Sequence, residues 1–138
     1  MRALGVDWGT KRIGLAVGES QFGISRALSP VAASGNLLQD AEALIAFARG
    51  ENCEVIVIGL PLQEDGSPGE VAKICLQLEE RIKELRFPVE TVNEAMTSLA
   101  AEADLVHSGY KAAGRKKRRD SAAAQIILDR FFSEQQKA

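Results

Sequence analysis

Three short apolar runs at the beginning of the chain predict β-strands. They cover residues 3–7, 13–18 and 24–31, and Pro30 is expected to end the third run because proline donates no hydrogen bond to a sheet. Only short polar turns separate the runs, so we expect an antiparallel meander. Asp7 then lies near the tip of the first hairpin, just before a Gly-Thr turn.

The apolar positions that follow have the helical period instead of the strand period. Asn36 can cap a helix, with Gln39 three residues further on, and Gly50 ends it. The apolar stripe of this helix is Leu37, Ala41, Leu44, Ile45 and Ala48. Residues 55–58 form an unbroken apolar run, which predicts a central strand that is covered on both faces.

The second half of the chain alternates helices and strands. Ser67-Pro68-Gly69-Glu70 has the pattern of a capping box and predicts a second helix, which Phe87-Pro88 bounds and whose stripe is Val71, Ile74, Leu78, Ile82 and Leu85. A strand at 89–92, a helix at 98–107 and a last helix at 120–135 follow. This order predicts an α/β fold with a five-stranded mixed sheet and helices on both faces.

Length and composition describe an ordinary globular protein. The 138 residues fit one domain, covering residues 1–138, which can bury a core without a disulfide or a structural zinc ion. Cys53 and Cys75 match no metal-binding spacing, so we expect two reduced core residues. No leader pattern opens the chain, and no run of about 18 apolar residues predicts a membrane span. We therefore expect a cytoplasmic protein that does not bind membranes.

Charge is unevenly distributed along the chain. The formal net charge is only -2, but one segment free of acids is strongly basic: Lys111, Arg115, Lys116, Lys117, Arg118 and Arg119. Such a segment can bind a polyanion even in an acidic protein. It is predicted as a loop before the last helix, and the alternative is that it is a solvated loop without a partner.

Three carboxylates fall at the edges of predicted elements: Asp7 after the first strand, Glu94 after the last strand, and Asp120 at the start of the last helix. Ligands of α/β proteins collect at such edges, where the three can converge. Each has a structural alternative as well. Asp7 can accept hydrogen bonds from turn amides, Glu94 can be an ordinary loop residue, and Asp120 can cap its helix.

If the three acids converge, their oxygens suit Mg²⁺ or Mn²⁺. Two such ions about 4 Å apart activate water and stabilise the leaving oxygen of a phosphodiester, which is nuclease chemistry. The cysteines and the single histidine, His107, form no zinc-binding set, so histidine-based acid-base catalysis is not expected.

Four spaced motifs together resemble the YqgF family of bacterial proteins, which is also described as Holliday-junction-resolvase-like and as a pre-16S rRNA nuclease. The motifs are Val6-Asp7-Trp8-Gly9-Thr10-Lys11-Arg12-Ile13-Gly14, Val57-Ile58-Gly59-Leu60-Pro61-Leu62 with Asp65-Gly66-Ser67, Asn93-Glu94-Ala95-Met96-Thr97-Ser98, and Asp120-Ser121-Ala122-Ala123-Ala124. They occur in the family's order and cover nearly the whole chain.

The resemblance implies a ribonuclease-H-like fold and a cytoplasmic, metal-dependent nuclease that matures the 5′ end of 16S ribosomal RNA. Asp7, Glu94 and Asp120 match the acidic positions of the family. The chain departs from it around Glu94, where relatives usually have an aspartate before the glutamate and an arginine after it, and this chain has Asn93 and Ala95. A partner in the assembling small ribosomal subunit is also implied.

The cations are assigned to substrate binding on this reading. Lys11 and Arg12 follow Asp7, and the basic segment from Lys111 through Arg115, Lys116, Lys117 and Arg118 leads into Asp120. Phosphate contacts on both sides of the acids would hold a nucleic-acid backbone across them. No residue separates RNA from DNA, so branched DNA is an alternative substrate.

Two rival functions remain at this stage. The Asp-x-Gly-Thr pattern also opens the phosphate-binding hairpin of actin-like and sugar-kinase ATPases, but those proteins need two such domains and this chain has no second hairpin of that kind. The other rival is a non-catalytic module of the same fold that binds structured RNA. Three mutually repelling carboxylates argue against the second rival, because a module without catalysis has no need of them.

Overall fold

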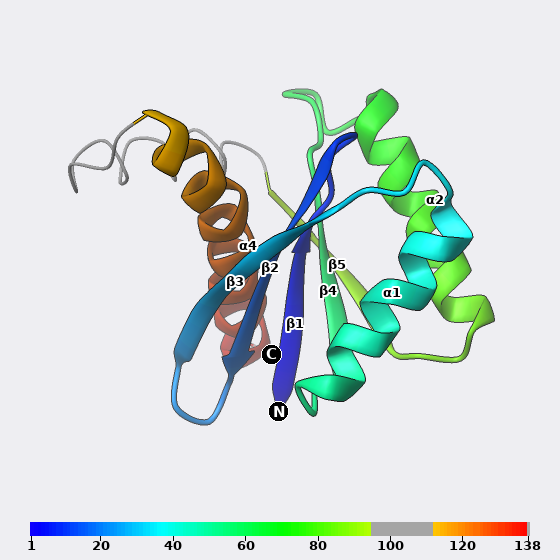
Figure 1. The fold of residues 1–138 in the computed structure, drawn as a ribbon. Helices are drawn as coiled ribbons and strands as arrows, with labels where there is room; N and C mark the ends of the chain where they lie inside the picture. Colours follow the sequence, from blue (N-terminus) through cyan, green and yellow to red (C-terminus); the bar gives the residue numbers. More distant parts are fainter. Residues whose placement is uncertain (95–111, 138) are drawn as a thin grey trace.

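The computed structural model contains one sheet with the strand order β3-β2-β1-β4-β5 (Figure 1). It describes residues 1–94 and 112–137, with side chains outside 112–120 and 136–137. The elements are β1 Arg2–Asp7, β2 Arg12–Glu19, β3 Ile24–Ala32, α1 Leu37–Gly50, β4 Val55–Leu60, α2 Glu70–Glu84, β5 Val89–Asn93 and α4 Ala112–Lys137. The helix predicted at 98–107 lies outside the described residues. Within the described ranges, no helix is both long and apolar enough to cross a membrane.

The predicted mixed sheet is confirmed. β1, β2 and β3 are antiparallel neighbours, and β4 and β5 add in parallel to β1. Val6 pairs with Ile58, and Leu60 pairs with Asn93. The carboxyl ends of β1, β4 and β5 therefore meet at one edge of the sheet, and the predicted acidic positions 7 and 94 both come to that edge.

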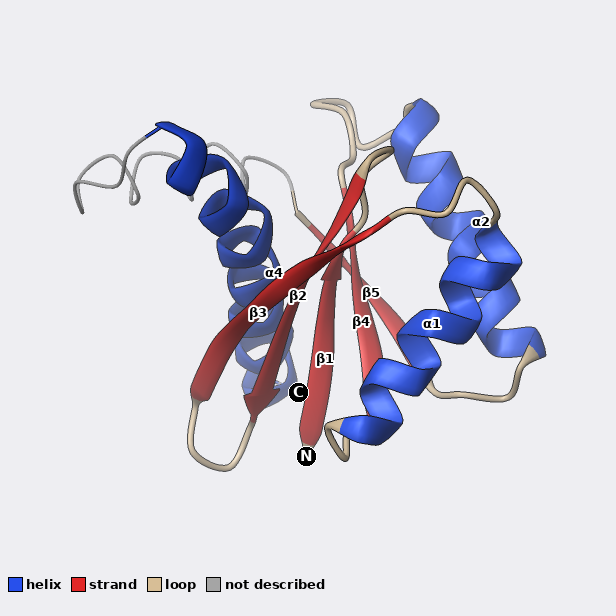
Figure 2. Cartoon of the chain, viewed as in Figure 1, coloured by secondary structure: helices blue, strands red, loops and turns tan. Residues whose placement is uncertain are grey.

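Helices cover both faces of the sheet, α1 and α2 on one side and α4 on the other (Figure 2). Along β1 the side chains alternate between them. Leu4 and Val6 belong to the core beneath α1 and α2, whereas Ala3 belongs to the core beneath α4. By this alternation Gly5 and Asp7 face α4. The carboxylate at the end of β1 thus points toward the last helix.

The last helix is longer than the sequence pattern predicted. α4 begins at Ala112 rather than near Asp120, so the basic segment is helical from position 112 onward and the prediction of a basic loop there is wrong. Alanine, lysine and arginine are strong helix formers, and a run of them outweighs a single capping signal. Asp120 consequently lies inside α4, and its alternative role as a helix cap is excluded. The predicted apolar face is confirmed by the burial of Ala124, Ile127 and Phe131.

The start of α2 also differs from its prediction. The helix begins at Glu70 with Gly69 as its N-cap and without a side-chain capping bond. Ser67 is instead used by the preceding loop, where its hydroxyl donates to Asp65 Oδ1 at 2.6 Å and its amide to the same oxygen at 2.9 Å. Val71 of the predicted stripe is 40% exposed, because the buried face is shifted to Ala72, Cys75, Leu78 and Ile82.

Two predicted boundaries have clear physical reasons. Asn36 caps α1 as predicted, since its side chain accepts a hydrogen bond from the amide of Gln39 at 3.0 Å. Pro30 does not end β3, which continues to Ala32. β3 is an edge strand with a register shift opposite Ile13 and Leu15, and an edge strand with an irregularity tolerates a residue that cannot donate to the ladder.

The contact between β1 and α4 can be tested with Gly5→Ala. A Cβ at this position would lie 2.7 Å from both Ala124 O and Leu128 Cγ. We expect the substitution to lower the free energy of unfolding by about 1–3 kcal/mol, as overpacking of a core does. Gly50→Ala is the matched control, because nothing lies within 4 Å of its Cβ position. Urea denaturation measures both, and equal stability of the two variants would contradict this packing.

Candidate active site

Asp7 is held in place by the end of β1 and by the tight loop that follows it. It pairs with Gly14 across the hairpin and is half-buried. The loop leaves no room for a side chain at Gly9, where a Cβ would lie 2.7 Å from Arg12 O. A close backbone turn of this kind fixes the direction of the strand end and of the carboxylate on it.

Glu94 reaches the same edge of the sheet from β5. Its amide donates to Leu60 O at 3.0 Å, which continues the parallel pairing of β4 and β5 by one residue. Its side chain is 7% exposed and lies over Gly59, where a Cβ would be 2.9 Å from both Cδ and Oε2 of Glu94. Gly59 is therefore required for the position of Glu94, because any side chain at 59 would occupy the space of the carboxyl group.

The two carboxyl groups interact strongly. Burial, the negative charge of Asp7 and a hydrogen bond to Asp7 together raise the pKa of Glu94 from 4.5 to about 9, and burial has the largest effect. In this contact the protonated Glu94 donates to the Asp7 carboxylate. Oε2 of Glu94 is buried and has no hydrogen-bond partner within residues 1–94 and the described part of α4. A proton thus lies between the two carboxyl groups, and a cation bound there would also relieve their repulsion.

The negative field of this pair extends to its surroundings. Burial raises the pKa of the Cys75 thiol to about 12, and the charges of Glu94 and Asp7 add to that increase. Cys75 and Cys53 are both free and buried, as predicted. Neither is activated as a nucleophile, because burial also raises the pKa of Cys53 and a raised thiol pKa lowers the thiolate fraction.

Arg130 is a neighbour of the site that the sequence analysis did not identify. From α4, its Nη1 donates to Asn93 O at 2.8 Å, next to Glu94. Its charge lowers the pKa of Glu94 and so opposes the larger effects of burial and Asp7. The sequence signal is weak, since Arg130 stands three residues after Ile127 on the edge of the apolar face, where a solvated arginine is common.

The backbone of Asp120 approaches the same edge. Ala124 packs on Gly5, and Phe132 packs on Gly18, which pairs with Ala3, so α4 runs antiparallel to β1. Asp120 lies one helical turn before Ala124, while Asp7 lies two residues after Gly5. At 1.5 Å per helical residue and about 3.3 Å per strand residue, both steps cover about 6 Å. The Asp120 side chain is outside those described, and among the described ones no three His, Cys, Asp or Glu residues form a metal-binding group.

Some of the predicted substrate-binding positions can be placed relative to this edge. Lys11 is exposed in the β1–β2 loop and Arg12 is half-buried at the start of β2. The backbone at positions 115–118 lies in the first turns of α4, at the helix end that faces the same edge (Figure 1). Lys111 lies outside the described residues.

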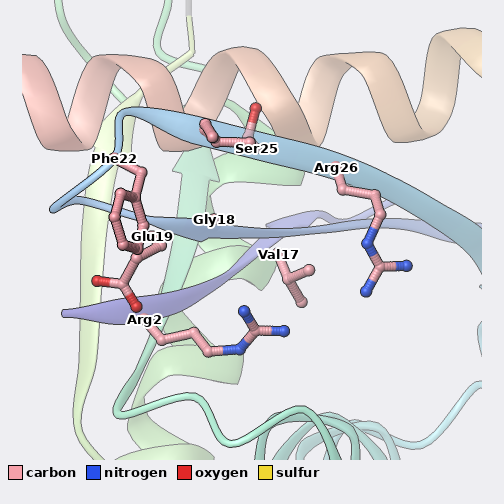
Figure 3. Close-up of a pocket in the computed structure, with 8 residues that line it drawn as sticks. Arg2, Val17, Gly18, Glu19, Phe22, Ser25 and Arg26 are labelled. Carbon is pink, nitrogen blue, oxygen red and sulfur yellow. The ribbon is translucent and has the colours of Figure 1, made fainter.

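A different hollow lies at the opposite end of β1 and has other chemistry. Arg2, Phe22 and Arg26 line it (Figure 3). Both arginines contact Oε2 of Glu51, at 3.2 Å from Arg2 and 3.4 Å from Arg26. Glu51 therefore offsets part of their charge, and Glu19 also lines the hollow, so this hollow is not a purely cationic site for an anion.

The comparison with known proteins identifies the family. Residues 1–134 match the family model of RuvX, described as Holliday junction resolvase. The chain belongs to the RuvX family. This confirms the resemblance derived from the four motifs, since RuvX and YqgF denote the same family.

Individual relatives agree with this RuvX assignment. A protein of Dechloromonas aromatica (strain RCB) is 36% identical over 131 residues, which are 94% of this chain and 88% of that protein. A protein of Anaeromyxobacter dehalogenans (strain 2CP-C) is 36% identical over 129 residues, 93% of each chain. Both carry the name "Putative pre-16S rRNA nuclease".

A solved structure supports the fold. RuvC of T. thermophilus in complex with Holliday junction substrate superposes with a TM-score of 0.59 at 19% identity, over 99% of this chain and 96% of RuvC. The predicted ribonuclease-H-like fold is thereby confirmed.

The raised pKa of Glu94 predicts a pH-dependent stability in the absence of metal. Between about pH 4.5 and pH 9 the folded protein retains a proton that the unfolded chain releases, so rising pH favours unfolding across this window. Glu94→Gln carries no such proton. We expect its free energy of unfolding to increase relative to wild type as the pH rises through that window.

Urea denaturation in the presence of a chelator, repeated across this pH range, measures the difference. Glu90→Gln is the matched control, because it removes a carboxylate from the exposed side of the same strand. A constant difference between Glu94→Gln and wild type at all pH values would show that Glu94 is ionised in the folded protein.

Proposed function

We propose that this protein is a metal-dependent nuclease that hydrolyses phosphodiester bonds, with Asp7, Glu94 and Asp120 as its catalytic and metal-binding residues. The observation that carries the proposal is the buried contact between Asp7 and Glu94, in which Oε2 of Glu94 has no partner among the side chains that the structure describes. Two carboxyl groups in such a contact destabilise the folded protein unless a proton or a cation lies between them. Membership of the RuvX family supports a nuclease over a structural role for this pair.

The residues at the site fit a hard divalent cation. Carboxylate oxygens are common ligands of Mg²⁺ and Mn²⁺. Asp7 and Glu94 supply such oxygens from the ends of two strands, which restrict the positions of both side chains. Asp120 is proposed as the third ligand because its backbone approaches Asp7 along α4. Bound Mg²⁺ or Mn²⁺, two ions in the usual arrangement, would activate a water molecule and stabilise the leaving oxygen.

The protein's own groups position the substrate and the acids. Lys11 and Arg12 bind phosphates on the β1–β2 side of the site, and the basic first turns of α4 bind the backbone on the other side. Arg130 holds Asn93 O at 2.8 Å and so fixes the strand end from which Glu94 projects. These contacts direct a phosphodiester toward the acids.

The substrate that we favour is RNA. The relatives from Dechloromonas aromatica and Anaeromyxobacter dehalogenans are named for pre-16S rRNA, so we propose 5′-end maturation of this RNA, in the cytoplasm and in association with the assembling small ribosomal subunit. Branched DNA is the second candidate, because the family model is described as Holliday junction resolvase. If no substrate is cleaved, we would instead assign the protein as a non-catalytic RNA-binding module.

Cleavage assays test the catalytic assignment. We expect Asp7→Asn and Asp120→Asn each to lower the cleavage rate by more than about 100-fold, because even groups that only support metal ligands contribute ten- to a hundredfold. End-labelled single-stranded RNA, single-stranded DNA and a four-way junction are incubated with Mg²⁺, Mn²⁺ or chelator. Products should form only with metal and wild-type protein.

Asp65→Asn is the control for this experiment, since Asp65 is an exposed carboxylate of the loop before α2. Thermal unfolding of each variant shows whether the fold is intact. Full activity of Asp7→Asn or Asp120→Asn would remove that residue from the site, and products formed in chelator would exclude metal dependence.

The basic segment makes a separate prediction. Replacing Lys116, Lys117 and Arg118 by glutamine should weaken nucleic-acid binding and flatten its salt dependence, by about 0.7–0.9 in log–log slope for each phosphate that the variant no longer neutralises. Fluorescence anisotropy at several salt concentrations measures this slope. Lys73→Gln with Lys83→Gln is the control, since both positions lie on the exposed surface of α2. An unchanged slope would show that the basic segment is solvated and does not contact the nucleic acid.

A further inference from the structure

A pocket of about 320 Å³ opens beside the β1–β2 loop, on the face of the sheet that α1 and α2 cover. Its apolar walls are Trp8, Ala33, Leu37 and Ile74, and Thr10 and Asp40 are its polar side chains. This volume is at the lower end of the range of small-molecule sites. The pocket therefore has room for a small ligand of about one ring system, not for a large one.

Asp40 gives the pocket its chemistry. This carboxylate is only 3% exposed, in the first turn of α1. The amide of Ser34 donates to its Oδ1 at 2.9 Å, and among the described residues no donor reaches Oδ2. Oδ2 is not one of the fully buried unpaired atoms of the described residues, so it is open to the pocket, and a ligand that supplies an N–H group could form a charge-assisted hydrogen bond with it.

Trp8 supplies an aromatic side chain to the same pocket. Its side chain is 9% exposed, and its indole Nε1 is buried without an acceptor among the described residues. The apolar ring of tryptophan is also a stacking surface for flat ligands. An aromatic wall beside an open carboxylate oxygen favours a flat ligand with an N–H group over a hydrocarbon.

The β1–β2 loop connects the pocket to the candidate active site, although the two lie on opposite faces of the sheet. Trp8 follows Asp7 directly, and the amide of Ala33 donates to Lys11 O at 3.0 Å, which ties the pocket wall to the loop that carries the proposed phosphate contacts. A strand of nucleic acid bound at Lys11 would therefore lie near this pocket. An unpaired base of that strand is the flat, polar ring closest to it.

We propose that this pocket binds one unpaired base of the nucleic-acid substrate and prefers a base with an exocyclic amino group, which donates to Asp40 Oδ2. Unpaired bases are commonly read by stacking on aromatic side chains and by hydrogen bonds to their edges. The proposal rests on the proposed function, because it assumes a nucleic-acid substrate. It assigns base preference to Asp40 and Trp8 rather than to the acids that act on the phosphate.

Oligocytidine and oligouridine are the probes of this contact, since position 4 of the ring carries an amino group in cytosine and a carbonyl group in uracil. Binding is measured in chelator by anisotropy of labelled RNA, and occupation of the pocket by the fluorescence of Trp8, the only tryptophan of the sequence. We expect oligocytidine to bind roughly three- to tenfold more tightly, the effect of about one hydrogen bond, with a change in Trp8 fluorescence.

Asp40→Asn is the decisive variant. The asparagine oxygen can still accept from Ser34, while its amide group replaces Oδ2 by a donor that matches the uracil carbonyl, so the preference should vanish or reverse. Glu42→Gln removes the same charge from the exposed side of α1 and should retain it. The comparison of the two RNAs on wild-type protein needs no variant and stands even if Asp40→Asn does not fold.

Two results would overturn the proposal, and they differ from each other. Binding of both RNAs with equal affinity, or without a change in Trp8 fluorescence, would reject the base pocket and leave the nuclease proposal intact. Absence of binding to either RNA would reject the pocket, and the cleavage assays with DNA substrates would then decide whether the nuclease proposal fails with it.

Discussion

The close approach of α4 to the sheet is the constraint on which the rest of the structure depends. Helix and strands touch at glycines: Ala124 and Leu128 lie against Gly5, Phe132 against Gly18, and Ile127 against Gly59. Because interiors are packed without free volume, these contacts fix the position of the helix along the strands. The same register brings Arg130 to the end of β5 and the backbone of Asp120 toward the end of β1. A shift of α4 by one turn would therefore disrupt the core and the acidic site together.

This packing also explains how the protein holds two carboxyl groups in contact. Glu94 is buried over Gly59 beside Asp7, an arrangement that its raised pKa marks as unfavourable for the ionised pair. Hydrophobic burial along α4 supplies the stabilisation that such a site requires, since large apolar side chains bury most of their surface there. Arg130 reduces the repulsion from one side only. The stability of the core thus offsets the unfavourable interaction of the two carboxyl groups in the absence of a proton or a cation. Active sites commonly lower the stability of the folded protein in this way.

Much of the fold could be predicted from local patterns, whereas the details of the site depend on contacts that are distant in sequence. The strands and the Asn36 cap follow from periodicity and from the chemistry of a short side chain. The start of α4 was missed because Asp120 has the properties of a cap, and only the helix-forming residues before it contradict that role. Ser67 is ambiguous in the same way, because its hydroxyl can form a hydrogen bond within a turn as well as at a helix cap. That positions 7 and 94 meet follows from the rule that parallel strands end at one edge of a sheet. The space over Gly59 and the contact of Arg130 with Asn93 could be found only in the structure. Gly59 is distant in sequence from Glu94, and Arg130 is distant from Asn93.

The β1–β2 loop has a different environment on each side of the sheet, and this difference has a consequence for recognition. Asp7 faces α4 and the other acids, while Trp8, the next residue, faces α1 and the pocket that contains Asp40. Successive residues of a strand point to opposite faces, so one short segment contributes both to a phosphate-directed site and to a base-directed pocket. The Gly9 turn and the hydrogen bond from the Ala33 amide to Lys11 O anchor this loop, and both sites are attached to it. Binding of a base on one side would then restrict which phosphodiester reaches the acids on the other, and the position of cleavage would follow from the geometry of the loop without any contact of the acids to a base.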